Sequence, residues 1–301
     1  MNLSADRWVL VLAHTGRPLA VSAATELLHL LVTAGFRPVM LAEEAADVPH
    51  EDPVRIVEDP CEVISEAELV MVLGGDGTIL RAAEVVRGQQ VPLLGVNLGH
   101  VGFLAESERE DLADAVERVA RRDYVVEERM TLDVRVTLHG QEIARTWAVN
   151  EATVEKASRE RVLEVVTEVD GRPVSTVGCD GVVMATPTGS TAYAFSAGGP
   201  VVWPDVEALL MVPISAHALF ARPLVVAPTS VLAVELLNRA GPGVLWCDGR
   251  RTVDVPPGAR VEVRRGVEPV RLARLATGPF TDRLVAKFRL PVTGWRGPAE
   301  R

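Results

Sequence analysis

Short apolar runs alternate with segments of helical periodicity along the first third of the chain. Four runs have the length of strands: Trp8–Ala13, Arg37–Leu41, Leu69–Leu73 and Val91–Val96. Two segments carry apolar residues at helical spacing: Leu19–Ala34, which Gly35 ends, and the charged stretch Arg109–Arg122. Strands that alternate with helices are typical of a parallel sheet covered by helices, with ligands at the carboxyl ends of the strands. We therefore predict an α/β domain here.

From Tyr124 onward the apolar period becomes that of strands. Leu132–Leu138 alternates strictly, and His139-Gly140 predicts a hairpin turn after it. Similar runs follow: Leu163–Val169, which Asp170-Gly171 closes, Val182–Ala185, Val231–Leu236 and Val261–Arg264. Several short strands with turn residues between them predict an all-β domain.

The chain is therefore expected to form an α/β domain over residues 1–124 and a β-sandwich-like domain over residues 125–272. Helical spacing returns after about Ala273, in Thr281–Arg289. We expect residues 273–301 to pack back on the α/β domain, whose sheet is mainly parallel.

The most informative stretch is Gly74-Gly75-Asp76-Gly77-Thr78, which lies between a strand and the helical segment Ile79–Val86. Glycines leave the backbone amides open to a ligand, and a helix start favours phosphate. Thr78 is expected to cap the helix. A carboxylate at Asp76 suits such a site only beside a divalent cation, or as the base that takes a proton from an attacking hydroxyl. Both roles indicate phosphoryl transfer, and the alternative is an ordinary strand-to-helix turn.

Composition narrows the class of protein. Of the 301 residues, 48% are hydrophobic and 24% charged, which is typical of a globular chain. No apolar run reaches the roughly 18 residues of a membrane span, and the first residues do not resemble a secretion signal. Three cysteines, Cys61, Cys179 and Cys247, have neither disulfide nor metal-site spacing. We expect a cytoplasmic protein without a membrane segment.

The balance of charge also restricts the partners. A net charge of −10 argues against nucleic acid. Only Lys156 and Lys287 are lysines among the 31 basic residues, and no Gly-Lys-Ser/Thr phosphate loop occurs. Any phosphate must therefore be bound by backbone amides, arginine and a metal ion.

Two further segments have features of ligand sites. Gly95–Leu104 leaves a strand with three glycines and is expected to form a second ligand-facing loop, although it lacks the G-x-G-x-x-G spacing of a dinucleotide fingerprint. Asn150-Glu151 ends a predicted strand, Thr146–Val149. An amide beside a carboxylate can bind vicinal hydroxyls, and a polar strand end is the alternative.

The segment from Gly178 to Pro200 has the chemistry of a nucleoside pocket. Six hydroxyl side chains lie between Thr186 and Ser196, with Tyr193 as an aromatic wall. Thr188–Thr191 is interpreted as a helix start whose amides are free for a polar ligand. A Ser/Thr-rich loop is the alternative. The loop Pro213–Pro223 contributes His217 as a supporting residue, and Asp248-Gly249 predicts a hairpin turn.

Together these motifs resemble the bacterial NAD kinases, which phosphorylate NAD to NADP with ATP. The resemblance runs essentially end to end. It rests on the following segments: GGDGT at Gly74–Thr78, G-x-N-x-G-x-x-G-F-L at Gly95–Leu104, Asn150-Glu151, TPTGSTAYxxSAGGP at Thr186–Pro200, PIxxHxLxxRP at Pro213–Pro223 and Asp248-Gly249. GGDGT alone is shared with diacylglycerol and sphingosine kinases, whereas GGDGT together with TPTGSTAY is specific to the NAD kinases.

The resemblance implies roles for particular residues. Asp76 is implied to be the base that takes the proton of the 2′-hydroxyl on the adenosine ribose of NAD. The residues implied at the ATP phosphates are Gly74, Gly75, Gly77, Thr78 and Arg81. The residues implied at NAD are Asp76, Gly77, Asn150, Glu151, Arg161, Asp180, Thr191, Ala192, Tyr193, Ala194, Phe195, Ser196 and Arg250.

Within the NAD set, Asn150, Glu151 and Asp180 are implied at the sugar and nicotinamide end, and Tyr193 with its neighbours at the adenine end. The metal ion, Mg²⁺ or Mn²⁺, is expected on the ATP phosphates with no dedicated protein site. The family further implies a homodimer or homotetramer with NAD between the two domains.

Two departures from the family pattern bear on this reading. Gly178-Cys179 stands where many relatives have a basic residue before Asp180, and Arg250 stands where many have glutamine. Two other functions are alternatives: a lipid kinase, which would need an apolar substrate pocket, and a dinucleotide sensor, which would have no use for Asp76. NAD and NADH, and ATP and polyphosphate, remain open as substrates.

Overall fold

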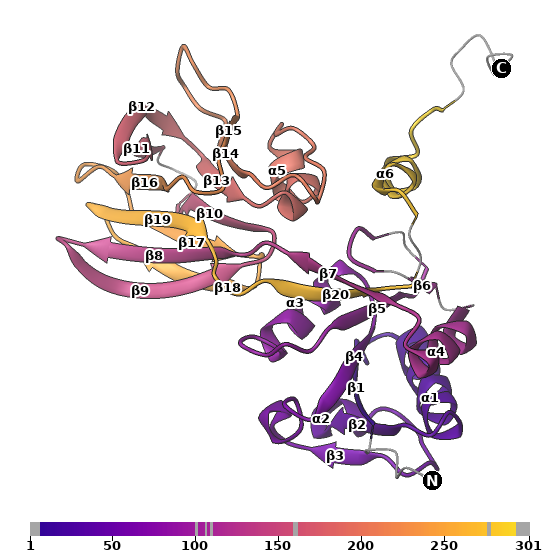
Figure 1. Ribbon diagram of the computed structural model, residues 1–301. Helices are drawn as coiled ribbons and strands as arrows, with labels where there is room; N and C mark the ends of the chain where they lie inside the picture. The colour runs from indigo at the N-terminus through magenta and orange to yellow at the C-terminus, as the bar shows by residue number, and fades with distance from the viewer. Residues whose placement is uncertain are drawn as a thin grey trace, which may run out of the picture. The chain divides into compact units, whose positions relative to one another are not determined.

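The computed structural model describes residues 7–99, 102–105, 107–108, 111–158, 162–275 and 278–292. It forms two compact units, Met1–Glu128 with Val270–Arg301, and Arg129–Pro269 (Figure 1). These junctions lie a few residues from those expected at 124 and 272. The difference arises because β7 (Val125–Arg129) and β20 (Val270–Arg274) are neighbouring strands of the first unit's sheet.

The sheet of the first unit has the strand order β3-β2-β1-β4-β5-β20-β7, with β6 paired to β5. Its remaining strands are β1 (Trp8–Ala13), β2 (Arg37–Leu41), β3 (Arg55–Val57), β4 (Ala67–Leu73), β5 (Leu93–Asn97) and β6 (Ser107–Glu108). The pairs from β3 through β5 to β20 are parallel. The predicted mainly parallel sheet is confirmed, and so is the return of the C-terminal segment to it.

The helices of this unit follow from their apolar spacing. They are α1 (Pro18–Thr33), α2 (Ala42–Ala45), α3 (Asp76–Val85), α4 (Leu112–Arg121) and α6 (Phe280–Phe288), with a 3₁₀ turn η1 at Pro60–Glu62. The buried residues of α1 recur every three or four positions: Ala20, Ala23, Ala24, Leu27, Leu28 and Leu31. All of them except Ala20 pack in one cluster with Val9 and Val11 of β1. None of the helices in the described part of the chain is long and apolar enough to cross a bilayer.

The second unit consists of two six-stranded antiparallel sheets. One has the order β12-β11-β16-β19-β8-β9 and the other β15-β14-β13-β10-β17-β18. Their bounds are β8 (Leu132–Leu138), β9 (Gln141–Ala148), β10 (Glu151–Lys156), β11 (Leu163–Val169), β12 (Arg172–Cys179), β13 (Gly181–Ala185), β14 (Leu209–Ile214), β15 (Leu224–Val226), β16 (Leu232–Leu236), β17 (Gly243–Cys247), β18 (Arg251–Val255) and β19 (Ala259–Arg265).

The two sheets share one hydrophobic core. Val134 of β8 and Val165 of β11 come from the first sheet, and Val154 of β10 and Leu245 of β17 from the second; all belong to a single buried cluster. Between β13 and β14 lie a 3₁₀ turn η3 (Thr188–Thr191) and the one-turn helix α5 (Tyr193–Ser196). The unit is therefore a β-sandwich, as predicted.

Three hairpin turns were predicted correctly. The central residues have positive φ angles of 50° and 79° at His139-Gly140, 53° and 71° at Asp170-Gly171, and 54° and 63° at Asp248-Gly249. Positive φ at both central positions defines the type I′ turn, for which Asp-Gly is a preferred pair. These turns connect β8 to β9, β11 to β12 and β17 to β18.

Some local predictions were wrong. Glu151 does not end a strand but is the first residue of β10, after β9 has ended at Ala148. The helical pattern expected after Ala273 is preceded by a strand, β20, that runs to Arg274. The strands β12 and β14, each of which contains a proline, were not predicted.

Candidate active site

The glycine loop follows β4 at the place where the order of the parallel strands reverses. From β1 the chain passes through α1 to β2 on one side, whereas β4 pairs with the other side of β1 and leads through α3 to β5. In open α/β sheets, ligands bind at the carboxyl ends of the strands at such a point. The amide of His14 donates to the carbonyl of Leu73 at 3.2 Å, so the end of β1 lies beside the loop.

The loop is built so that only glycine fits at Gly74. A Cβ there would lie 2.3 Å from Oγ1 of Thr78, well inside any permitted contact. Helix α3 begins at Asp76 and has Gly75 as its N-cap, with no side-chain cap. The prediction that Thr78 caps the helix is therefore wrong, because Thr78 lies inside the first turn and covers Gly74. The start of α3 leaves the amides of Asp76 and Gly77 without an intrahelical acceptor.

Asp76 is hydrogen-bonded to the second glycine loop, at Phe103 and Leu104. Its carboxylate accepts hydrogen bonds from the amides of Phe103 and Leu104, each at 3.1 Å. A Cβ on Gly102 would lie 2.4 Å from Oδ1 of Asp76, so the close approach requires glycine at that position. Two donors leave lone pairs on both carboxylate oxygens for a further hydroxyl. His100 and Val101 of the same loop lie outside the described residues.

Arg81 does not have the surroundings expected of a phosphate ligand. Its guanidinium forms ion pairs with Glu43 and Glu44 of α2. Glu44 is 3% exposed and also accepts the amide of Ala13, at the end of β1, at 2.8 Å. Burial raises the pKa of Glu44, whereas the Ala13 amide and Arg81 lower it. Arg81 thus ties α3 to α2 and β1, an arrangement that the sequence did not predict.

In the second unit, β10 presents polar side chains on one face and apolar ones on the other. Ala152 and Val154 are fully buried in the core between the two sheets. On the opposite face lies a cavity of about 230 Å³. The described residues that line it are Glu151, Thr153, Glu155, Tyr193, Trp246, Asp248 and Gly249.

Among the ionisable groups that line this cavity, Glu151 has the pKa that lies furthest from its usual value. It is 7% exposed, and its Oε2 atom is buried without a hydrogen-bond partner in the described part of the chain. Burial raises the pKa of Glu151 to about 8; Asp248 also raises it, and the amide of Tyr193 lowers it. Since an unpaired buried carboxyl group is costly, the arrangement favours a ligand that supplies the missing hydrogen bond.

Asp248 fixes the backbone beside Glu151. Its carboxylate accepts the amides of Val149 and Asn150 at 2.9 and 2.7 Å and pairs with Arg251 at 2.9 Å. Burial raises the pKa of Asp248, and these donors lower it. The sequence identified only a turn here, with Arg250 as a contact. Arg250 is exposed, and its neighbour Arg251 makes the ion pair. No local signal distinguishes the two arginines.

In the hydroxyl-rich segment Thr186–Ser196, some hydroxyl groups predicted to face a ligand are hydrogen-bonded within the protein instead. Thr186 Oγ1 donates to the carbonyl of Val149 at 2.6 Å, and Ser190 Oγ bonds the carbonyl of Val202 at 3.1 Å. Two of the amides expected to be free are used as well: the amide of Gly189 donates to Thr186 Oγ1, and that of Ser190 donates to the carbonyl of Pro187. The segment is therefore partly a scaffold.

Gly189 allows this segment to reach Asn150. A Cβ on Gly189 would lie 2.0 Å from the carbonyl oxygen of Asn150, so the two backbones are in direct contact. The amide of Thr186 also donates to the Asn150 carbonyl, at 2.9 Å. The structure thus brings together two motifs that the sequence placed separately.

The expected NAD-binding residues of α5 differ in exposure. Tyr193 is 39% exposed and Phe195 41%, and Ser196 is also exposed, whereas Thr191 and Ala192 are half-buried. Ala194 is fully buried in a cluster with Val183 and Val212, so only its backbone could meet a ligand. The hydroxyl of Tyr193 donates to Glu155; burial first, and then Glu155, raise the pKa of Tyr193.

Asp180 has a cationic partner from another strand. Lys156 at the end of β10 forms an ion pair with it, and this bond, together with that from Ser215, holds the pKa of Asp180 below its usual value. Lys156 is thus a cation beside Asp180, although Gly178-Cys179 supplies none. His217 donates its amide to the carbonyl of Gly178 at 2.8 Å. Arg161 lies outside the described residues.

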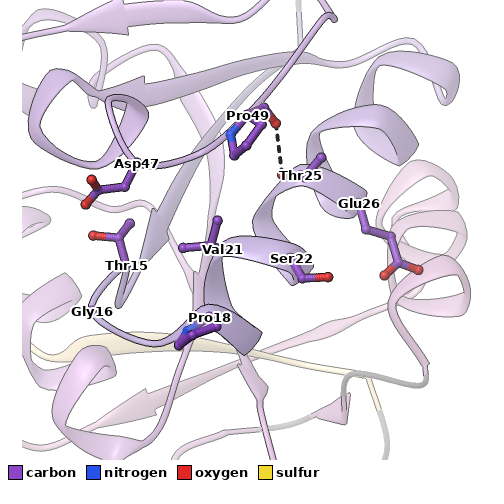
Figure 2. Close-up of a pocket in the computed structure, with 9 residues that line it drawn as sticks. All are labelled: Thr15, Gly16, Pro18, Val21, Ser22, Thr25, Glu26, Asp47 and Pro49. Carbon is purple, nitrogen blue, oxygen red and sulfur yellow. Dashed lines mark hydrogen bonds between the residues drawn. The ribbon is translucent and has the colours of Figure 1, made fainter.

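A larger cavity, of about 740 Å³, lies in the first unit at the start of α1. Figure 2 shows the residues that line it: Thr15, Gly16, Pro18, Val21, Ser22, Thr25, Glu26, Asp47 and Pro49. Thr25 Oγ1 donates to the carbonyl of Pro49 at 2.8 Å. The described lining has two carboxylates and no cation, which does not suit phosphate. Within the part of the chain that the structure covers, no three acidic, histidine or cysteine side chains form a metal site.

Comparison with known proteins gives the same family for the N-terminal and the C-terminal parts of the chain. Residues 9–124 match the ATP-NAD kinase N-terminal domain and residues 149–275 the ATP-NAD kinase C-terminal domain. The chain is 64% identical to an NAD kinase of Leifsonia xyli over 303 residues, covering 99% of this chain and 100% of that protein. It is 63% identical to NAD kinase 2 of Streptomyces coelicolor over 298 residues, covering 99% of each.

Solved structures share the fold. The crystal structure of yeast NADH kinase with NADH has a TM-score of 0.87 at 21% identity, covering 96% of this chain and 89% of that one. The crystal structure of an Archaeoglobus fulgidus NAD kinase with ATP has a TM-score of 0.70 at 25% identity, covering 94% and 98%.

Proposed function

The chain belongs to the NAD kinase family, and from this premise we propose how its residues transfer a phosphoryl group from ATP to NAD. As an NAD kinase it moves the γ-phosphoryl group of ATP to the 2′-hydroxyl of the adenosine ribose, giving NADP. The observation that carries the assignment of roles is the position of Asp76. It lies on the loop after β4 with both carboxylate oxygens anchored to backbone amides and still able to accept a hydroxyl.

Asp76 acts as the general base. It accepts the proton of the ribose 2′-hydroxyl as that oxygen attacks the γ-phosphorus. The amides at the start of α3, on Asp76 and Gly77, bind the ATP phosphates, with Gly74 and Gly75 keeping the approach open. Catalysis of this transfer rests mainly on positioning and on neutralisation of charge.

A metal ion, Mg²⁺ or Mn²⁺, would be held chiefly by the ATP phosphates. Mg²⁺ commonly keeps several waters and binds one or two carboxylates together with substrate phosphates, so a site with the single carboxylate of Asp76 fits it. The chemistry that such an ion would supply is neutralisation of charge on the transferred phosphoryl group. Arg81 supports this region indirectly, by holding α3 to α2 through Glu43 and Glu44.

NAD is bound by the residues around β10 and α5. The unpaired Oε2 of Glu151 supports this assignment, since a ribose hydroxyl or an amide would complete its hydrogen bonds. Asn150, held by Asp248, and Asp180, held by Lys156, contribute further polar contacts. We also infer from the family that the enzyme is a cytoplasmic homodimer or homotetramer.

One assay tests the proposed activity. Purified protein is incubated with ATP, Mg²⁺ and either NAD or diacylglycerol, and NADP and phosphorylated lipid are measured. We expect NADP from NAD and no phospholipid. Phosphorylation of the lipid alone would contradict the function, and binding of NAD without turnover would indicate a sensor instead.

A further inference from the structure

The short loop whose amides bind Asp76 is itself bound by two arginines from the C-terminal part of the chain. Arg274 of β20 donates from Nη1 to the carbonyl of Leu104 at 3.1 Å. Arg283 of α6 donates from Nη1 to the carbonyl of Phe103 at 3.3 Å. These are the two loop residues whose amides donate to the carboxylate of Asp76. The loop therefore lies between a carboxylate on one side and guanidinium groups on the other.

A single peptide group connects Arg283 with Asp76. The carbonyl of Phe103 and the amide nitrogen of Leu104 belong to one peptide unit, which is planar and trans, so its C=O and N–H point in opposite directions. Arg283 binds the oxygen of this unit, and Asp76 binds its N–H. A cation at the carbonyl polarises the peptide and strengthens the N–H as a donor. The orientation of the Asp76 carboxylate is thus coupled to the position of Arg283.

Aromatic contacts attach helix α6 to the same loop. The ring of Phe103 is buried, and its centroid lies 5.7 Å from that of Phe280 and 5.9 Å from that of Phe288. Separations of this size are typical of favourable aromatic pairs. Phe280 and Phe288 are the first and last residues of α6, and Arg283 lies between them. The rings therefore fix the helix that carries Arg283 to the backbone that binds Asp76.

The two arginines differ in how directly they can be tested. Arg274 is 7% exposed and also donates from Nε to Glu127 of β7 at 2.7 Å, so its replacement would disturb the sheet as well as the loop. Arg283 is only half-buried, and no residue of α6 is fully buried among those described. A substitution at Arg283 is therefore expected to leave the fold intact.

We propose that Arg283 is a positioning residue for phosphoryl transfer. Through the peptide between Phe103 and Leu104, it fixes the carboxylate of Asp76 in the orientation that accepts the ribose proton. The proposal rests on the proposed function, in which Asp76 is the base, and extends it to the C-terminal helix. Because Arg283 acts through Asp76 and not on a substrate, its loss should slow turnover and leave the binding of NAD and ATP unchanged.

Steady-state kinetics with NAD and Mg-ATP test this role. Arg283→Met removes the cation and keeps a long aliphatic side chain, whereas Arg283→Lys keeps the cation. We expect kcat of Arg283→Met to fall about tenfold with both KM values within about twofold of wild type, and Arg283→Lys to recover most of the loss. The matched control is Arg289→Met, at the exposed C-cap of the same helix, which should leave kcat unchanged.

A double-mutant cycle separates positioning of Asp76 from a general effect on structure. In the Asp76→Asn enzyme, adding Arg283→Met should lower the residual kcat by less than about twofold, because residues that act through one group have non-additive effects. Arg283→Gln, which also lacks the charge, replaces Arg283→Met in these experiments if the latter does not fold, and the same losses are expected.

Three results would overturn the proposal: an equal loss of kcat in both backgrounds, a raised KM for ATP with kcat unchanged, or an Arg283→Lys enzyme as slow as Arg283→Met. The outcomes also distinguish this proposal from the proposed function. Wild-type turnover in Asp76→Asn would refute the role of Asp76 as the base. Wild-type turnover in Arg283→Met, with Asp76→Asn inactive, would refute the role of Arg283 alone.

Discussion

At the scale of single residues, the site depends on carboxyl groups in three different environments. Asp76 is anchored by backbone amides, Glu151 is buried with an Oε2 atom that has no hydrogen-bond partner among the described residues, and Asp180 is paired with Lys156. In the proposed mechanism the same functional group therefore serves as a base, as a buried hydrogen-bonding group and as a member of an ion pair.

Asp76→Asn should keep the fold and the binding of NAD but lose at least about two orders of magnitude in kcat, since it preserves the shape and deletes the base. Steady-state kinetics and NAD titration measure the two effects. Asp205→Asn serves as a control, because it makes the same substitution in the second unit outside the proposed site. Turnover within a few-fold of wild type would show that Asp76 is not the base.

The raised pKa of Glu151 predicts how stability depends on pH. The folded protein holds this proton up to about pH 8, whereas the unfolded chain releases it near 4.5. The contribution of Glu151 to the free energy of unfolding is therefore present below about pH 4.5 and is lost as the pH rises to 8. Glu151→Gln should remove this loss, on the order of 5 kcal/mol, and so stabilise the ligand-free protein at pH 8 relative to wild type.

Urea unfolding at pH 5, 7 and 8 with wild type and Glu151→Gln measures this difference. The two stability curves should diverge as the pH rises. Curves that stay parallel would mean that Glu151 is not buried as a neutral acid. Glu142→Gln, an exposed glutamate, should run parallel to wild type.

At the scale of elements, glycines determine how closely the loops approach the active groups. Gly102 lies against the carboxylate of Asp76, and Gly189 against the backbone of Asn150. Neither glycine has a positive φ angle in the left-handed range, so the requirement comes from packing and not from the backbone conformation.

Gly102→Ala places a Cβ 2.4 Å from Oδ1 of Asp76 and must displace either the loop or the carboxylate. We expect kcat to fall by about tenfold or more, because the carboxylate of Asp76 loses its position. The midpoint of thermal unfolding should change little, because the substitution affects a short loop and leaves helix α3 in place. Kinetics and thermal unfolding on the same preparation separate the two. Gly278→Ala is the matched control, since its Cβ would meet no atom within 4 Å. An active Gly102→Ala enzyme would mean that the loop is not positioned by Asp76.

At the scale of the whole molecule, the proposed reaction uses groups from both compact units. Asp76 belongs to the first unit, and Glu151, Asp180 and Tyr193 belong to the second. A ligand bound by the folded state alone stabilises the protein by RT ln(1 + [L]/Kd), about 2.7 kcal/mol at a hundredfold excess over Kd. Residues of both units should therefore respond to NAD.

Hydrogen exchange with and without NAD tests this expectation. NAD should slow exchange in peptides that contain Glu151 and Tyr193, and also in the loop Gly74–Thr78. Mg-ATP alone should protect the loop and leave the peptides of β10 and α5 nearly unchanged. Protection by NAD confined to residues 1–128 would place the dinucleotide on the first unit alone and would contradict the assignment of Glu151 and Tyr193.

The sequence by itself determined the features that depend on neighbouring residues. The strands β1 and β2, the period of α1 and the three type I′ turns follow from apolar spacing and from positive φ at Asp-Gly and His-Gly. The glycine loop between strand and helix, with its carboxylate, is equally local. So is the family to which the chain belongs, because its motifs are short and contiguous.

Only the tertiary structure decided which side chains are available for chemistry. Asp248 binds the amide of Asn150 across 98 residues of sequence, and Asp76 binds that of Leu104 across 28. The same long-range packing engages Arg81 with α2, buries Ala194, and leaves Oε2 of Glu151 unpaired. Burial and hydrogen-bond partners depend on contacts between distant strands, and no local pattern of residue types encodes which partners will meet.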